Sequence, residues 1–152
     1  MKSKINSSKA PEPVGSYPHA RRVGNLLFLS GVGPRKLGTK VIPGVMVDGQ
    51  GNALSHDIEV QCHSVFENIE TILKDSGSNW DNLVDVTVFL INMKRDFDIY
   101  NEIYAQYFKD NQPCRTTVEV SSLPTPIAIE LKCIATIGSV SYTHLRAHET
   151  ID

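Results

Sequence analysis

The feature that most constrains the fold is an apolar stripe at helical spacing between residues 57 and 74. Its members recur every three or four positions: Ile58, Cys62, Val65, Ile69, Ile72 and Leu73. Ser55 is a candidate N-cap, and Gly77 lies just past the last apolar residue, as is typical of a helix end. An amphipathic helix has to bury its stripe against a second layer, which the rest of the chain must supply.

Strands are predicted on both sides of this helix. Residues 19–23 and 26–31 flank the turn Gly24-Asn25 and predict a hairpin, while 84–91 alternates apolar and polar side chains. Further strands are expected at 113–120 and 127–135, and a short one at 44–47. The polar residues 1–13 contain two prolines, and we expect the first nine to lack regular structure.

A second helix is predicted over residues 96–108. Its apolar side is aromatic and consists of Phe97, Tyr100, Tyr104, Tyr107 and Phe108. Such a stripe favours a place in the core over a stacking platform for bases. Helices separated by hairpins and single strands predict an α+β domain in which both helices cover one face of a mixed sheet.

Composition narrows the class of protein. Hydrophobic residues make up 41% of the 152 residues, which suits one domain with a buried core. The net charge of −2 gives no basic excess for nucleic acid, no apolar run approaches a membrane span, and no secretory signal is seen at the start. Three widely spaced cysteines, Cys62, Cys114 and Cys133, indicate reduced thiols in a cytoplasmic protein. Cys62 and Cys133 are expected in the core.

The end of the chain differs from the rest. Residues 138–152 do not continue the pattern of the domain and resemble a vector- or adaptor-derived extension. We therefore assign the single domain to residues 1–137 and treat 138–152 as a non-native extension.

The candidate functional residues are most concentrated near residues 113–120. Alternation along this strand places Arg115, Thr117 and Glu119 on one face and Thr116 and Val118 on the other, which is apolar enough to bury. The strand at 127–135 follows after a short turn and carries Glu130. If the two strands are neighbours, Arg115 and Glu130 are within reach of one small ligand. The alternative is a surface ion pair on a hairpin.

The sequence contains no established motif that identifies a reaction. The sequence has no phosphate-binding glycine motif, no nucleophile elbow and no Cys/His cluster of zinc type, so neither a metal nor a cofactor is predicted. What remains is a set of single polar residues at strand ends, each of which alone would be interpreted as structural: Tyr17, Ser30, Asn101, Arg115, Thr117 and Glu130.

Taken together, these residues resemble a known signature. Asn101, the segment Pro113 to Val120, Leu123-Pro124 and Ile129-Glu130 are similar to the reactive intermediate deaminase family, called Rid or YjgF. Tyr17, Ser30-Gly31 and the helix with Gln61 and Asn68 match the same family, over residues 10–137. Within it, the segments 14–19, 92–97 and 124–130 resemble the 2-aminomuconate deaminase branch, which works in the catabolism of aromatic compounds.

The resemblance implies a fold and an assembly. The expected fold is the chorismate-mutase-like α+β fold with a mixed six-stranded sheet, assembled as a homotrimer with three clefts between subunits. Arg115 matches the arginine that holds a substrate carboxylate, and Glu130 matches the acid that handles water. Tyr17, Ser30, Gly31 and Asn101 match residues that line the cleft. Thr117 is also expected to bind substrate, but it stands where many members carry cysteine, so no thiol role carries over.

The resemblance also implies cofactor-independent hydrolysis of enamines and imines. The first hypothesis is deamination of 2-aminomuconate to 2-hydroxymuconate (4-oxalocrotonate) and ammonia. A dicarboxylate needs a second cation, and the candidates are Arg21, Arg22, Lys94 and Arg95, with Lys94 or Arg95 preferred. Two alternatives stay open: a general deaminase for 2-aminoacrylate-type intermediates, and a non-catalytic ligand-binding trimer. RNA cleavage is disfavoured by the acidic balance.

Overall fold

The computed structural model describes residues 3–36, 39 and 41–138 and contains one central sheet. The spatial order is β1-β2-β3-β8-β6-β7. These strands are β1 (Lys4–Ile5), β2 (Ala20–Val23), β3 (Leu26–Leu29), β6 (Leu83–Leu90), β7 (Cys114–Glu119) and β8 (Ile129–Thr136). All neighbours pair antiparallel except β6 and β7, which are parallel. The predicted mixed sheet of six strands is confirmed.

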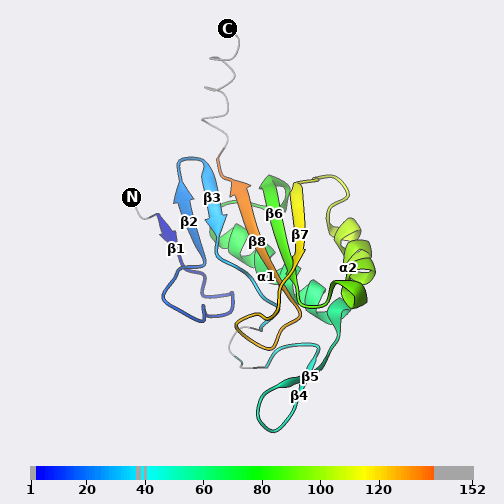
Figure 1. Cartoon of the computed structure of the whole chain (residues 1–152). Coiled ribbons are helices and arrows are strands. Elements are labelled where there is room, and N and C mark those ends of the chain that lie inside the picture. The colour runs from blue at the N-terminus through cyan, green and yellow to red at the C-terminus, as the bar shows by residue number, and fades with distance from the viewer. Residues whose placement is uncertain (1–2, 37–38, 40, 139–152) are drawn as a thin grey trace, which may run out of the picture.

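Two helices complete the α+β domain, and Figure 1 shows how they accompany the sheet. Helix α1 (Ile58–Asp75) is capped by Asp57, whose side chain accepts from the Val60 N–H, so the predicted cap at Ser55 is wrong. Gly77, with φ +81°, follows the helix end as expected. Helix α2 (Met93–Tyr107) begins three residues earlier than predicted because Asn92 caps it.

The core lies between these helices and the sheet. The α1 stripe is buried as predicted, together with alternate residues of β6 and β8 such as Val86, Val88 and Leu131. Cys62 and Cys133 are buried, as expected, and burial raises the pKa of each thiol to about 12. Phe66 packs against Tyr107 of α2, and Trp80 packs against Phe108, the C-cap of the same helix. Much of the aromatic stripe is therefore core.

The sequence does not predict two short strands, one at Lys4–Ile5 and one at Ala53–His56. The expected strand at 44–47 is β4 (Val45–Val47), and it pairs with an unexpected β5 (Ala53–His56) in a separate two-stranded sheet, which projects at the bottom of Figure 1. Strand β1 pairs with β2, which corrects the expectation of an unstructured start. The proposed extension at 138–152 lies outside the described residues apart from Gly138. Along the described part of the chain, we find no helix that is both long and apolar enough for a membrane span.

Strands β7 and β8 are not neighbours, contrary to the prediction. Strand β6 lies between them and pairs with both (Figure 1). The segment β6-α2-β7 is a parallel crossover unit, which returns β7 to the free edge of β6. Strand β8 then occupies the other edge of β6, so no β7–β8 hairpin forms and the surface ion pair that a hairpin would carry is excluded.

Candidate functional site

Arg115 is held by one face of α2. Its guanidinium carbon lies 4.7 Å from the ring centroid of Tyr104, 5.6 Å from that of Tyr100 and 6.0 Å from that of Phe97. Its Nη1 donates a hydrogen bond to Asn101 Oδ1 at 2.8 Å. The four α2 residues are spaced at i, i+3, i+4 and i+7, so they form a single helical stripe. The predicted pair Arg115 and Asn101 is thus brought together.

The faces of β7 are the reverse of the prediction. Arg115 pairs with Val86, which is fully buried, and residues paired across strands share a face. Arg115 and Thr117 therefore face the helices and are half-buried, whereas Thr116 and Val118 are exposed on the other face. The aromatic rings of α2 offer the arginine a favourable partner that apolar side chains alone would not.

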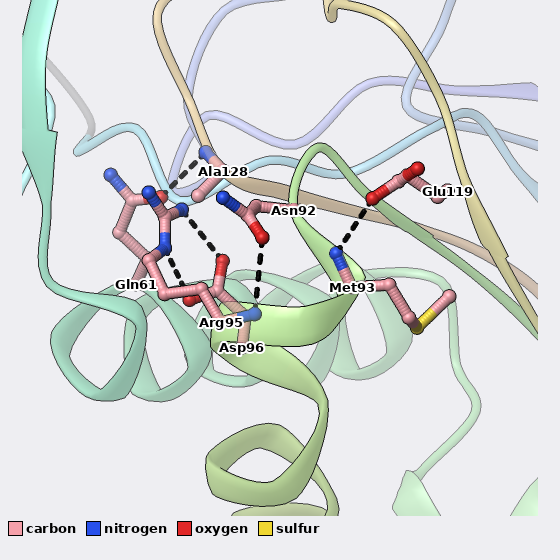
Figure 2. A network of polar contacts seen from close by, with 7 residues as sticks. All are labelled: Gln61, Asn92, Met93, Arg95, Asp96, Glu119 and Ala128. Carbon is pink, nitrogen blue, oxygen red and sulfur yellow. Dashed lines mark hydrogen bonds and ion pairs between the residues drawn. The ribbon is translucent and has the colours of Figure 1, made fainter.

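Helix α2 is fixed to β7 at its first turn. The Met93 N–H donates to Glu119 Oε1 at 2.9 Å, and Asn92 Oδ1 accepts from the Arg95 N–H at 3.0 Å (Figure 2). These contacts satisfy backbone donors that a helix start leaves free. Because Glu119 and Arg115 belong to the same strand, the contact also sets which face of α2 lies over Arg115.

The Arg115 guanidinium has no carboxylate partner in the described part of the chain. The two ion pairs found there are Lys74–Glu70 and Arg95–Asp96. Glu119, on the same face of β7, is occupied by the α2 backbone. An arginine carries five N–H donors, so Arg115 keeps most of its donors available for an anion.

Three hydroxyls near Arg115 lack partners. Thr117 Oγ1, Tyr100 Oη and Tyr104 Oη are buried without a hydrogen bond. Burial raises the pKa of both tyrosine hydroxyls, that of Tyr104 to about 12, although the nearby Arg115 lowers each in part. Both tyrosines therefore stay neutral at physiological pH and contribute ring faces and hydroxyl groups, not charge.

A second cluster surrounds Glu130 in a cavity. The cavity is lined by four of the predicted site residues, Tyr17, Ser30, Gly31 and Glu130, together with His19 and Arg35 among others. Gly31 approaches Glu130 so closely that a Cβ there would lie 2.9 Å from Glu130 Oε2. Burial raises the pKa of the Glu130 carboxyl above its ordinary value of 4.5. The cavity thus holds an acid that takes up protons more readily than an exposed one.

Two polar side chains of the cavity are already committed. Ser30 Oγ donates to the Pro18 carbonyl at 2.7 Å. His19 Nδ1 accepts from the Ser7 N–H at 2.9 Å, so Nε2 carries the proton and donates to the Pro11 carbonyl at 2.6 Å. Both residues hold the loop over residues 7–18 in place. Of the two carboxyl groups that line the cavity, Glu12 is exposed and Glu130 is partly buried, which makes Glu130 the candidate acid–base group.

Polar side chains of α1 position the walls of this cavity. Gln61 Oε1 accepts from the Ala128 N–H at 2.8 Å, two residues before Glu130 (Figure 2). Asn68 Nδ2 donates to the carbonyls of Gly33 and Arg35, at 2.9 Å each. The amides of Gln61 and Asn68 on α1 thus bind the backbone of the two loops that pass beside the helix.

The two clusters are far apart within one chain. Arg115 pairs with Val86 of β6, whereas Glu130 pairs with Phe89, three residues further along. An odd offset places them on opposite faces of the sheet. Strand spacings put their backbones about 10 Å apart across the sheet and about 10 Å along it. The expectation that one chain brings both to one ligand is wrong.

The candidates for a second cation do not line the Glu130 cavity. Arg21, Arg22, Lys94 and Arg95 are absent from the lining of the Glu130 cavity, while Arg35 is present. Arg95 is bound to the buried carboxylate of Asp96 through Nε and Nη2, each at 2.7 Å (Figure 2). Both residues of the preferred pair are exposed, but Lys94 makes no ion pair with any residue that the structure describes.

Comparison with known proteins places this arrangement in a family. A profile described as Endoribonuclease L-PSP matches residues 7–137. A RutC family protein of Pyrococcus abyssi is 38% identical over 135 residues, which cover 88% of this chain and 96% of the relative. This chain belongs to the Rid/YjgF (L-PSP) family.

Two further relatives of this Rid/YjgF chain carry informative names. Reactive Intermediate Deaminase A, chloroplastic, of Arabidopsis thaliana is 38% identical over 136 residues, which cover 90% of this chain and 66% of the relative. The crystal structure of E. coli TdcF with bound serine has a TM-score of 0.76 and 28% identity, and the match covers 90% of this chain and all of TdcF. Since one relative is chloroplastic, the cytoplasmic location of this Rid/YjgF chain stays a prediction.

The sequence pattern of this Rid/YjgF chain does not identify several residues of the two clusters. The pattern predicts Phe97, Tyr100 and Tyr104 as core residues, yet they also contact Arg115. The sequence could have indicated this contact, because Asn101, a predicted site residue, lies on the same helical stripe as these three aromatic residues. Arg35 could not be predicted from the sequence, because it lies in an irregular segment whose backbone is held by the hydrogen bond from Asn68 to the Arg35 carbonyl.

Proposed function

We propose that this protein hydrolyses 2-imino and 2-enamino acids to 2-oxo acids and ammonia, without a cofactor, in clefts between the chains of a cytoplasmic homotrimer. The deaminase name of the Arabidopsis relative supports the reaction class. The observation that carries the proposal is the pairing of chemical roles: Arg115 lacks a protein anion among the described residues, and Glu130 has a raised pKa.

Arg115 supplies the carboxylate grip. A guanidinium binds a carboxylate through two parallel, charge-assisted hydrogen bonds, each worth about 1.5–3 kcal/mol. The serine bound in the related TdcF structure is itself an amino acid with a carboxylate, which supports this class of ligand. Fixing the carboxylate also orients the adjacent imine carbon for attack.

Glu130 supplies the proton transfers. An enamine first tautomerises to the imine, whose C2 is electrophilic. The Glu130 carboxylate takes a proton from water while the water oxygen bonds to C2, and it passes that proton to the imine nitrogen, which gives a carbinolamine. Glu130 then transfers the hydroxyl proton of the carbinolamine to the amino nitrogen as the C–N bond breaks, which releases ammonia and leaves the 2-oxo acid. A carboxyl whose pKa is raised toward neutrality suits both taking and giving a proton.

Two chains are needed because Arg115 and Glu130 lie on opposite faces of one sheet. Among the described residues, no helix covers the other face of the sheet, which carries the partly buried Phe28, Phe89 and Ile134 beside the exposed Val118. An apolar sheet face of this kind favours burial against another copy. In a closed ring, each copy can offer Glu130 to one neighbour and Arg115 to the other.

The test is ammonia release from enzymatically generated 2-aminoacrylate. We expect turnover by the wild type, and a loss of roughly 100-fold or more in kcat/KM in Arg115→Ala and in Glu130→Gln. Arg21→Ala, an exposed arginine on β2, is the matched control and should behave as wild type. Binding of the amino acid or 2-oxo acid without release would instead indicate the non-catalytic trimer. Turnover unaffected by Arg115→Ala would refute the proposal.

A second candidate substrate is the dicarboxylate 2-aminomuconate. Arg35 favours it, because this cation lines the same cavity as Glu130 and its backbone is held by Asn68. In this case Arg35→Ala should raise KM for 2-aminomuconate by about tenfold and leave KM for 2-aminoacrylate unchanged. Lys94→Ala is the control. Equal effects on both substrates would reject the dicarboxylate assignment. RNA cleavage is not proposed, because the net charge is −2.

A further inference from the structure

The aromatic residues of α2 do more than fill the core. We propose that Tyr104, supported by Tyr100 and Phe97, is a positioning residue that orients Arg115 so that its Nε–Nη2 edge receives the substrate carboxylate. This inference rests on the proposed function, since it assigns Arg115 a carboxylate to bind. It adds residues to the site that neither the sequence motifs nor the chemistry of hydrolysis identify.

The geometry of the three rings supports a guiding role. An arginine side chain is long and rotatable, and its planar head must be held to present two parallel donors. Tyr104 lies nearest the guanidinium, at 4.7 Å, while Tyr100 and Phe97 lie at 5.6 and 6.0 Å. All three rings come from one helix whose start is tied to β7 through Glu119 and Met93. The rings therefore keep a fixed position relative to Arg115.

The contribution of the tyrosines resides in their ring faces. The hydroxyls of Tyr100 and Tyr104 are buried without partners, so they fix nothing by hydrogen bonding within the described part of the chain. Face contact with a cation depends on the ring and not on the hydroxyl. Phenylalanine should consequently replace Tyr104 with little change, whereas leucine should not.

Asn101 determines which edge of the guanidinium is free. Its Oδ1 accepts from Nη1 of Arg115 at 2.8 Å. The opposite edge, formed by Nε and Nη2, makes no hydrogen bond among the described residues, and it presents two parallel donors at the spacing of a carboxylate. Asn101 and the rings together leave this edge as the one that can bind in two-pronged fashion.

The first experiment compares KM and kcat for 2-aminoacrylate in Tyr104→Phe, Tyr104→Leu and Tyr107→Leu. Tyr107 is the matched control, because it is a partly buried aromatic residue of α2 that packs on Phe66 and Trp80 and is absent from the rings around Arg115. We expect KM to rise roughly tenfold in Tyr104→Leu, with a smaller change in kcat. Tyr104→Phe and Tyr107→Leu should keep the wild-type KM.

The second measurement does not depend on turnover. The Nε–Hε resonance of Arg115, assigned by its absence in Arg115→Ala, should carry a ring-current shift that disappears in Tyr104→Leu and persists in Tyr107→Leu. An unchanged resonance in Tyr104→Leu, or a KM that matches the Tyr107→Leu value, overturns the inference. If Arg115→Ala loses activity while Tyr104→Leu keeps its KM, only this inference fails. If Arg115→Ala stays fully active, the proposed function fails with it.

Discussion

Arg115 and Glu130 lie on opposite faces of the sheet, on strands that β6 separates. Arg115 has no carboxylate partner in the described part of the chain, so it can bind an anion. The pKa of the Glu130 carboxyl is raised, so this group can exchange protons more readily near neutral pH. A single chain cannot bring them to the same small molecule. The function that we propose for the two residues therefore requires the assembly of at least two chains.

Complementation between inactive variants tests this dependence. Arg115→Ala keeps Glu130, and Glu130→Gln keeps Arg115, so a cleft between one copy of each can contain both intact groups. With random assembly of equal amounts, about a quarter of the clefts in a symmetric ring should be intact. We expect a co-refolded mixture to recover about that fraction of the wild-type rate in an ammonia-release assay.

The control for complementation is the double variant Arg115→Ala/Glu130→Gln. Mixed with Arg115→Ala it offers no intact Arg115, so no activity should return. Failure of the two single variants to complement, under conditions in which wild-type chains refold to active protein, would refute a cleft that takes Arg115 from one copy and Glu130 from another.

Gly31 is predicted to matter because of its contact with Glu130. An alanine Cβ would lie 2.9 Å from Glu130 Oε2, and the end of a flexible side chain can move away from it. Gly31→Ala should therefore fold normally but displace the carboxylate, with kcat/KM lowered by about tenfold or more. Gly49→Ala is the matched control, because nothing lies within 4 Å of its added Cβ. Equal activity in the two variants, measured with their melting temperatures, would count against the assigned place of Glu130.

Arg95 is predicted to stabilise the fold and not to bind substrate. Its guanidinium pairs with Asp96, which is 1% exposed. Removing one partner of a fully buried pair costs about 3–5 kcal/mol, and because 42% of the Arg95 side chain is exposed we expect about 2 kcal/mol for Arg95→Ala. Urea unfolding measures the loss, and the exposed neighbour Lys94→Ala should change stability by less than about 0.5 kcal/mol. A specific rise in KM for 2-aminomuconate in either variant would restore these two residues as carboxylate readers.

Helix α1 could be predicted because its stripe, from Ile58 to Leu73, is long and regular. The start of α2 could not, because Asp96 resembles a residue of a helix beginning, whereas Asn92 caps the helix and Asp96 is buried against Arg95. Local sequence does not reveal which of two nearby acidic or amide residues satisfies the backbone and which pairs with a cation.

The order of strands and their faces depends on tertiary packing. The short turn between β7 and β8 favours a hairpin on local grounds, yet the crossover through α2 brings β7 to the edge of β6. Likewise Val118 suggested a buried face, while the rings of α2 place Arg115 inward instead. The roles of Arg115 and Glu130 came from resemblance to a family, because single polar residues at strand ends carry no pattern of their own.

The titration of Glu130 should make kcat/KM fall on the acidic side of the pH–rate profile, and we call this fall the acidic limb. As a general base Glu130 must be ionised, so kcat/KM should fall as the pH drops through its pKa, which burial raises above the ordinary value of 4.5. The measurement is the pH–rate profile for 2-aminoacrylate, with buffers matched for ionic strength. Glu130→Gln should retain only slow turnover without this limb. A limb that persists in Glu130→Gln would assign the titration to another group.

The same shift predicts how stability depends on pH. A carboxyl whose pKa is higher in the folded state binds protons more tightly there, so its contribution is fully present below the ordinary value of 4.5 and is lost as the pH rises through the raised pKa. The neutral amide that Glu130→Gln introduces avoids that loss. We therefore expect Glu130→Gln to be more stable than the wild type at pH 7, and the difference to shrink when urea unfolding is repeated at pH 4. A wild type that gains stability relative to the variant between pH 4 and pH 7 would show that Glu130 is stabilised as the carboxylate in the assembled protein, by a cation such as the Arg115 of a neighbouring chain.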